Sequence, residues 1–134
     1  MNHFLLFVNK VNPMSTALVV EDCLTDKAVL TSCLQQGGLN VVTADSAEEA
    51  LEKISSYEVD VIILDVVLPD RCGFEICRDL KAEDKTKNIP IVMCSTKGGH
   101  MDKFWGLKQG ADAYLKKPID QEEFVSTVKQ LIKR

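Results

Sequence analysis

Residues 59–65 read VDVIILD, and this stretch decides the fold of a chain of 134 residues. The run is apolar apart from Asp60 and ends in a second acid, Asp65. Short continuous apolar runs are typical of strands that are buried on both faces of a parallel sheet. We therefore predict a strand over residues 59–64, central in an α/β domain, with Asp65 at its carboxyl end.

Four further short apolar runs predict strands, over residues 17–20, 41–43, 91–94 and 113–115. Helical spacing of apolar residues predicts five helices between and after them, over residues 25–36, 46–56, 74–83, 101–109 and 120 onward. Ser46 and Glu49 form a capping box at the start of the second helix, and Gly110 follows the fourth. Strands and helices therefore alternate along the whole domain.

This alternation predicts a parallel sheet with helices on both faces. Right-handed crossovers leave few topologies, and we expect a flavodoxin-like (βα)5 three-layer sandwich with strand order 2-1-3-4-5. In such a sheet the functional site lies beyond the carboxyl ends of the strands, where the first and third strands are neighbours.

The composition is that of one soluble globular domain, with 46% hydrophobic and 27% charged residues. A net charge of −4 argues against binding to nucleic acid. The longest apolar run at the N-terminus, Phe4 to Val8, is too short to span a membrane, so we expect a cytoplasmic protein with no membrane insertion. The five cysteines are expected to be small buried hydrophobes in a reducing compartment.

The domain is expected to begin at Met14. Met14-Ser15-Thr16 resembles a second translation start directly before the first strand. Residues 1–13 are therefore treated as an N-terminal extension, and residues 14–134 as the folded domain.

Polar residues follow four of the predicted strands. Glu21 and Asp22 end the first strand and Asp65 ends the third, while Ser95 ends the fourth and Lys117 follows the fifth. Three carboxylates at neighbouring strand ends repel one another unless a divalent cation lies among them, and oxygen ligands with open positions suit Mg²⁺.

With Mg²⁺ held by the acids, one carboxylate can act as a nucleophile toward a phosphoryl donor. Asp65 is the candidate because its strand is central. Lys117 would neutralise charge on the transferred oxygens, and Ser95 would donate a hydrogen bond to the phosphate.

These residues carry a resemblance to the receiver domains of two-component response regulators, over about residues 15–134. The segments that match the family are Val19-Val20-Glu21-Asp22, Leu64 to Asp70 with Gly73 following, Ile91 to Thr96, and Lys116-Lys117-Pro118. The resemblance implies a signalling protein rather than an enzyme. Such a protein catalyses only its own phosphorylation and dephosphorylation. A sensor histidine kinase, of the CheA type for instance, would phosphorylate Asp65.

The resemblance also implies roles for single residues. Glu21, Asp22, Asp65 and the backbone carbonyl of Val67 would bind Mg²⁺, and Lys117 would contact the phosphate. Ser95 and Tyr114 would be the switch pair, and the peptide bond before Pro118 would be cis. Val67 and Lys97 stand at variable positions beside the site that tune the lifetime of the phosphate.

Because Arg134 ends the sequence, the match is expected to be with stand-alone, CheY-like regulators that bind a downstream effector protein. Residues 102–110 most resemble regulators of type IV pilus motility, of the PilH type. The aromatic side chain of Trp105 is expected in the core, although it could lie near the output face.

Three alternatives remain open from the sequence. A flavodoxin-like cofactor binder needs a loop rich in hydroxyl groups and glycine after the first strand, where this chain has Glu21 and Asp22. A small phosphotransferase is disfavoured because no P-loop motif is present and because Val67 stands where an aspartate phosphatase has a second acid. A degenerate receiver that serves only as a scaffold is disfavoured because every site residue is present.

Overall fold

The computed structural model describes residues 14–133, which form a five-stranded parallel sheet with helices on both faces. The strands are β1 (Thr16–Val20), β2 (Asn40–Ala44), β3 (Val61–Leu64), β4 (Ile91–Ser95) and β5 (Ala113–Lys116). Their order in the sheet is β2-β1-β3-β4-β5, and every neighbouring pair is parallel. The predicted flavodoxin-like topology is confirmed.

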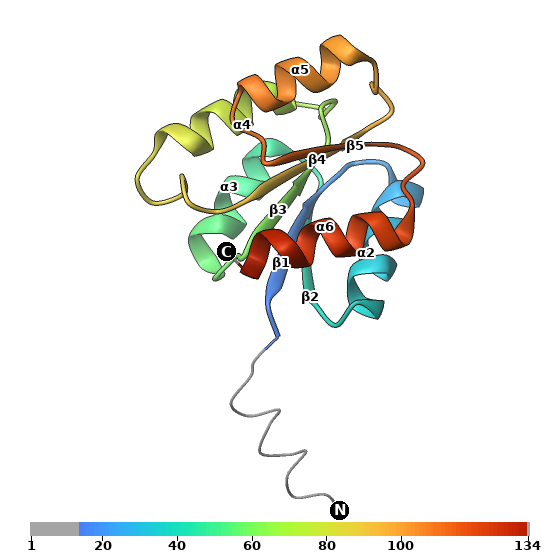
Figure 1. Ribbon diagram of the computed structural model, residues 1–134. Helices are drawn as coiled ribbons and strands as arrows, with labels where there is room; N and C mark the ends of the chain where they lie inside the picture. Colours follow the sequence, from blue (N-terminus) through green and yellow to red (C-terminus); the bar gives the residue numbers. More distant parts are fainter. Residues whose placement is uncertain (1–13, 134) are drawn as a thin grey trace, which may run out of the picture.

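The helices are α2 (Leu24–Gln36), α3 (Ala47–Ser56), α4 (Gly73–Ala82), α5 (His100–Lys108) and α6 (Gln121–Lys133). Helices α2 and α6 cover one face of the sheet, and α3, α4 and α5 lie on the other (Figure 1). Each face has its own hydrophobic core, and β3 contributes Ile62 and Leu64 to one core and Val61 and Ile63 to the other. This double burial explains why the strand is apolar at every position.

Helix α3 begins at the predicted N-cap, Ser46, but only half of the predicted capping box is present: the Glu49 carboxylate accepts a hydrogen bond from the Asp45 amide at 2.6 Å rather than from the Ser46 amide. The helix also has a second cap from outside. The Ser46 hydroxyl accepts a hydrogen bond from the Glu49 amide at 3.1 Å. The Asp70 carboxylate, from the loop after β3, accepts hydrogen bonds from the amides of Ala47 at 2.9 Å and Glu48 at 3.0 Å. These amide donors hold the pKa of Asp70 below its ordinary value. The loop after Asp65 is therefore fastened to a neighbouring helix.

Two expectations about burial were wrong. Cys23 and Cys72 are exposed, because they are the N-cap residues of α2 and α4 and lie in loops. The other three cysteines are buried as expected, and burial raises the pKa of Cys77 to about 11 and that of Cys94 to about 12. Trp105 is not in the core: 47% of its surface is exposed, because it lies on the outer side of α5.

Most element boundaries agree with the predictions to within a residue or two. Strand β3 begins at Val61 rather than at residue 59, and Asp60 before it accepts a hydrogen bond from the Thr16 amide at 2.8 Å. The extension 1–13 lies outside the described residues. Among residues 14–133, no helix has both the length and the apolar composition needed to cross a membrane.

Candidate functional site

An acidic cluster lies at the carboxyl edge of the sheet. Strands β1 and β3 pair in a register that places Val20 beside Leu64, so the residues that follow them, Glu21 and Asp65, are neighbours. Carboxylate oxygens of Glu21, Asp22 and Asp65 all lie within 4.8 Å of one another. Glu21 is buried, the Asp65 side chain is 11% exposed and Asp22 is exposed, so the cluster opens to solvent on one side.

Lys117 points into this cluster from the loop after β5. Its ammonium donates hydrogen bonds to Glu21 Oε1, to Asp26 Oδ2 at 3.0 Å and to Asp65 Oδ2 at 3.4 Å. Its amide donates to the Ser95 carbonyl at 2.9 Å, and the following peptide bond to Pro118 is cis, as expected. The loop is therefore fixed by backbone contacts while the ammonium is held by carboxylates.

The pKa values within the cluster reflect burial and close charges. Burial, reinforced by the charge of Asp65, raises the pKa of Glu21 even though the hydrogen bond from Lys117 lowers it. Burial pulls the pKa of Lys117 down, but hydrogen bonds to Glu21 and Asp26 and the charge of Asp65 outweigh it, and the net pKa is raised. Lys117 therefore carries its positive charge at neutral pH.

The donor set fits Mg²⁺. Three carboxylates close together supply hard oxygen ligands, and the exposed side of the cluster leaves room for water and substrate oxygens. No histidine or cysteine belongs to this group of candidate ligand atoms. The single positive charge of Lys117 neutralises the three carboxylates only in part, so the remaining negative charge favours binding of a divalent cation.

The loop after Asp65 passes unusually close to the strand that precedes it. A Cβ atom on Gly73 would lie 2.1 Å from the Asp65 carbonyl oxygen, so only glycine fits there. Val67 is 54% exposed, and its amide faces Asp65 Oδ1 at 3.4 Å. That contact orients the Asp65 carboxylate, whereas metal binding by the Val67 carbonyl stays a prediction.

Ser95 and Tyr114 are linked through the backbone of Lys97. The buried Ser95 hydroxyl accepts a hydrogen bond from the Lys97 amide at 3.2 Å. The Tyr114 hydroxyl donates to the Lys97 carbonyl, and the ring is only 7% exposed. Burial raises the pKa of this phenol. Both predicted switch residues therefore contact one loop, between β4 and α5.

Sequence reasoning missed one carboxylate beside the cluster. Asp26 lies in the first turn of α2 and contacts Lys117, although it does not follow a strand. A signal was present: a helix that starts at the carboxyl edge of a parallel sheet directs its first turn toward the same site.

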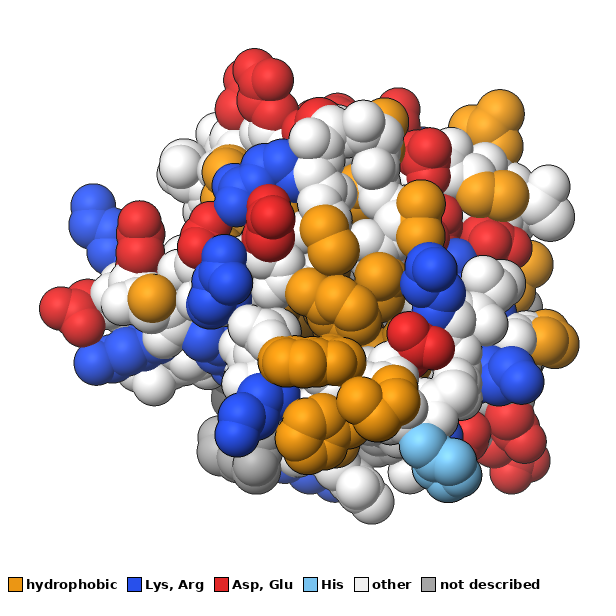
Figure 2. Space-filling model, turned by 90° about the horizontal axis from the view of Figure 1, so that it is seen from above, with side chains coloured by type: hydrophobic (Ala, Val, Ile, Leu, Met, Phe, Trp, Pro, Cys, Tyr) orange, Lys and Arg blue, Asp and Glu red, His pale blue; other side chains and the backbone are white. Residues whose placement is uncertain are grey.

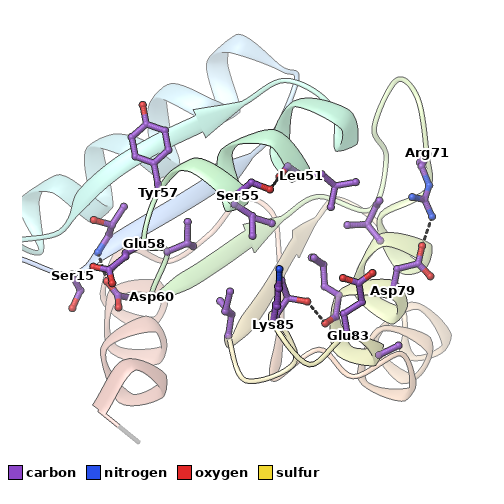
Figure 3. A pocket seen from close by; sticks show the side chains of 18 of the residues that line it. Ser15, Leu51, Ser55, Tyr57, Glu58, Asp60, Arg71, Asp79, Glu83 and Lys85 are labelled. Atoms are coloured by element: carbon purple, nitrogen blue, oxygen red, sulfur yellow. Dashed lines mark hydrogen bonds and ion pairs between the residues drawn. The ribbon is translucent and has the colours of Figure 1, made fainter.

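A large groove lies elsewhere, between α3 and α4. It has a volume of about 1160 Å³, and its lining includes Leu51, Tyr57 and Asp79 (Figure 3). None of the acidic-cluster residues lines it. The acidic cluster at the sheet edge is thus separate from this groove.

Comparison with known proteins defines the class. Residues 17–129 match the family model described as "Response regulator receiver domain". The chain belongs to this family. Receiver domains are phosphoacceptor signalling modules of two-component systems rather than conventional enzymes.

Individual relatives narrow the class further. The chain is 33% identical over 119 residues to protein PilH of Pseudomonas aeruginosa, covering 89% of this chain and 98% of PilH. It is 38% identical over 117 residues to the transcriptional regulatory protein PhoP of Bacillus subtilis, covering 87% of this chain but only 48% of PhoP.

Solved structures of response regulators also resemble this chain. A response regulator from Chloroflexus aurantiacus has a TM-score of 0.87 at 36% identity, covering 90% of this chain and 99% of that one. The chemotaxis protein CheY4 of Vibrio cholerae has a TM-score of 0.81 at 32% identity, covering 88% of this chain and 98% of that one. The protein is therefore a CheY-like receiver similar to PilH.

Proposed function

We propose that this receiver accepts a phosphoryl group on Asp65 from a sensor histidine kinase and thereby changes its binding to an effector protein. The observation that carries the proposal is the contact of the Lys117 ammonium with Asp65 inside a cluster of three carboxylates. Mg²⁺ would be held by Glu21, Asp22, Asp65 and the Val67 carbonyl. It would supply charge neutralisation for the transferred phosphoryl oxygens.

In the proposed reaction one Asp65 carboxylate oxygen attacks the phosphorus of a phosphohistidine. A P–O bond forms, the P–N bond breaks, and the imidazole nitrogen keeps the electron pair. Lys117 donates hydrogen bonds to the phosphoryl oxygens, where negative charge accumulates. The Val67 amide orients the carboxylate, and Ser95 donates its hydroxyl to the finished phosphate. Later attack by water on phosphorus returns the free carboxylate, so the only reactions catalysed are those of the protein's own phosphate.

The switch follows from the Lys97 loop. A phosphate that attracts the Ser95 hydroxyl changes the loop that also holds the Tyr114 hydroxyl. A charge-assisted hydrogen bond that is about 2 kcal/mol stronger in one state shifts a two-state ratio roughly thirty-fold. Phosphorylation would thereby change the face formed by α5, β5 and α6.

That face is suited to an effector. Met101, Phe104, Trp105 and Leu107 of α5 are each 47% or more exposed. Figure 2, which looks down on the α5 side of the molecule, shows hydrophobic side chains gathered there with basic side chains nearby. Similarity to PilH and to the chemotaxis protein CheY4 supports a role in motility or taxis signalling. A location in the cytoplasm and a CheA-like kinase as the donor are part of the same proposal.

The test is phosphorylation by a small phosphodonor, acetyl phosphate, with Mg²⁺ and detection by intact mass. The wild-type chain should gain one phosphate, and Asp65→Asn should gain none. Labelling of Asp65→Asn to the wild-type extent would refute the assignment. Failure of both to label, with the fold intact by circular dichroism, would favour a degenerate receiver used as a scaffold.

A further inference from the structure

Lys117 is shared among three carboxylates, and the role of one of them is unassigned. Asp26 Oδ2 lies 3.0 Å from the Lys117 ammonium, closer than Asp65 Oδ2 at 3.4 Å. Glu21 and Asp65 belong to the candidate metal cluster, whereas Asp26 does not. Asp26 therefore holds the lysine on which the proposed phosphoryl transfer depends, without sharing in the metal site.

The three partners of Lys117 differ in burial. The side chain of Glu21 is 1% exposed, that of Asp65 is 11% exposed and that of Asp26 is 38% exposed. A buried carboxylate that loses its ammonium partner is left as a costly unpaired charge. An exposed carboxylate is hydrated by water instead, so its ion pair contributes little. Asp26 is thus the partner that Lys117 can release at the least cost.

We propose that Asp26 is a positioning residue that competes with the phosphoryl group for Lys117. The inference rests on the proposed function, because it presumes a phosphoryl group on Asp65. In the free state Lys117 binds Asp26 together with Glu21 and Asp65. In the phosphorylated state the additional negative oxygens on Asp65 attract the ammonium, and Asp26 turns to solvent.

Asp26 also acts through its own charge. Its carboxylate and that of Asp65 contact the same ammonium, so a phosphoryl group on Asp65 lies close to a second negative charge. The two like charges repel each other, and solvent screens this repulsion only in part because Lys117 and Asp65 are largely buried. Both effects lower the stability of the phosphorylated state relative to the free state.

The test compares three variants of the full chain. Asp26→Asn removes the competing charge, and Asp26→Glu retains it. Asp45→Asn is the matched control, because Asp45 follows β2 at the same sheet edge and pairs with Lys27 rather than Lys117. Calorimetry at saturating Mg²⁺ measures the dissociation constant of beryllofluoride, a phosphoryl mimic. Intact mass after acetyl phosphate treatment measures phosphorylation itself.

Asp26→Asn should bind beryllofluoride about three- to five-fold more tightly than wild type, the size expected for a partly exposed charge. Asp26→Glu and Asp45→Asn should bind as wild type does. Unchanged or weaker binding by Asp26→Asn, or an equal gain in Asp45→Asn, would overturn the inference while wild-type labelling of Asp65 leaves the proposed function intact. Absence of any label on the wild-type chain would overturn both.

Discussion

Replacement of Gly106 by alanine tests how closely α5 approaches the Tyr114 ring. A Cβ atom at Gly106 would lie 2.5 Å from Tyr114 Cδ2, 2.9 Å from Cε2 and 3.1 Å from Met93 Sδ. Overpacking of this kind costs about 1–3 kcal/mol, whereas glycine to alanine within a helix gains about 1 kcal/mol. We expect Gly106→Ala to lower the free energy of unfolding by about 0–2 kcal/mol.

The sign of this effect should reverse when the ring is removed. In a Tyr114→Ala background the ring atoms are gone and only the flexible Met93 thioether remains near the new methyl group. Gly106→Ala should then raise the free energy of unfolding by about 1 kcal/mol, the helix propensity gain alone. Urea unfolding followed by circular dichroism measures all four proteins of the double-mutant cycle. The same change in both backgrounds would refute the reasoning, because it would show that the Tyr114 ring is not the obstacle.

Three further outcomes are expected. Asp22→Ala should weaken Mg²⁺ binding by at least about ten-fold in calorimetry, because it removes a candidate metal ligand; unchanged affinity would count against the site. Ser95→Ala should still accept phosphate but show a reduced change in amide hydrogen exchange over residues 96–110 on addition of beryllofluoride; a full wild-type response would exclude Ser95 as the switch. In the native protein at pH 8 a thiol reagent should label Cys23 and Cys72 rapidly and the other three cysteines only after denaturation, because buried thiols with raised pKa values remain protonated. Rapid labelling of more than two cysteines in the native protein would contradict the burial of the other three.

The sheet and the acidic cluster could be predicted because both follow from periodicity and parallel pairing. A strand buried on both faces must be apolar throughout, and residues after neighbouring parallel strands must meet. Asp26 could not be placed in the same way, because its contact depends on the rotation of α2 about its own axis. The mistake over Trp105 has a similar cause: apolar residues of α5 lie on more than one side of the helix, so their presence does not identify its buried face.

The Asp70 cap described above sets a limit on the length of one loop. Two anchors flank it: Gly73 is pressed against the Asp65 carbonyl, and Asp70 is bonded to the first turn of α3. A residue inserted between Asp65 and Asp70 would displace one anchor or the other. Insertions there should be selected against, and a reporter domain should not be grafted at this loop. Residues 83–85 are exposed and distant in the chain from both anchors, so they offer the better insertion point for an engineered sensor.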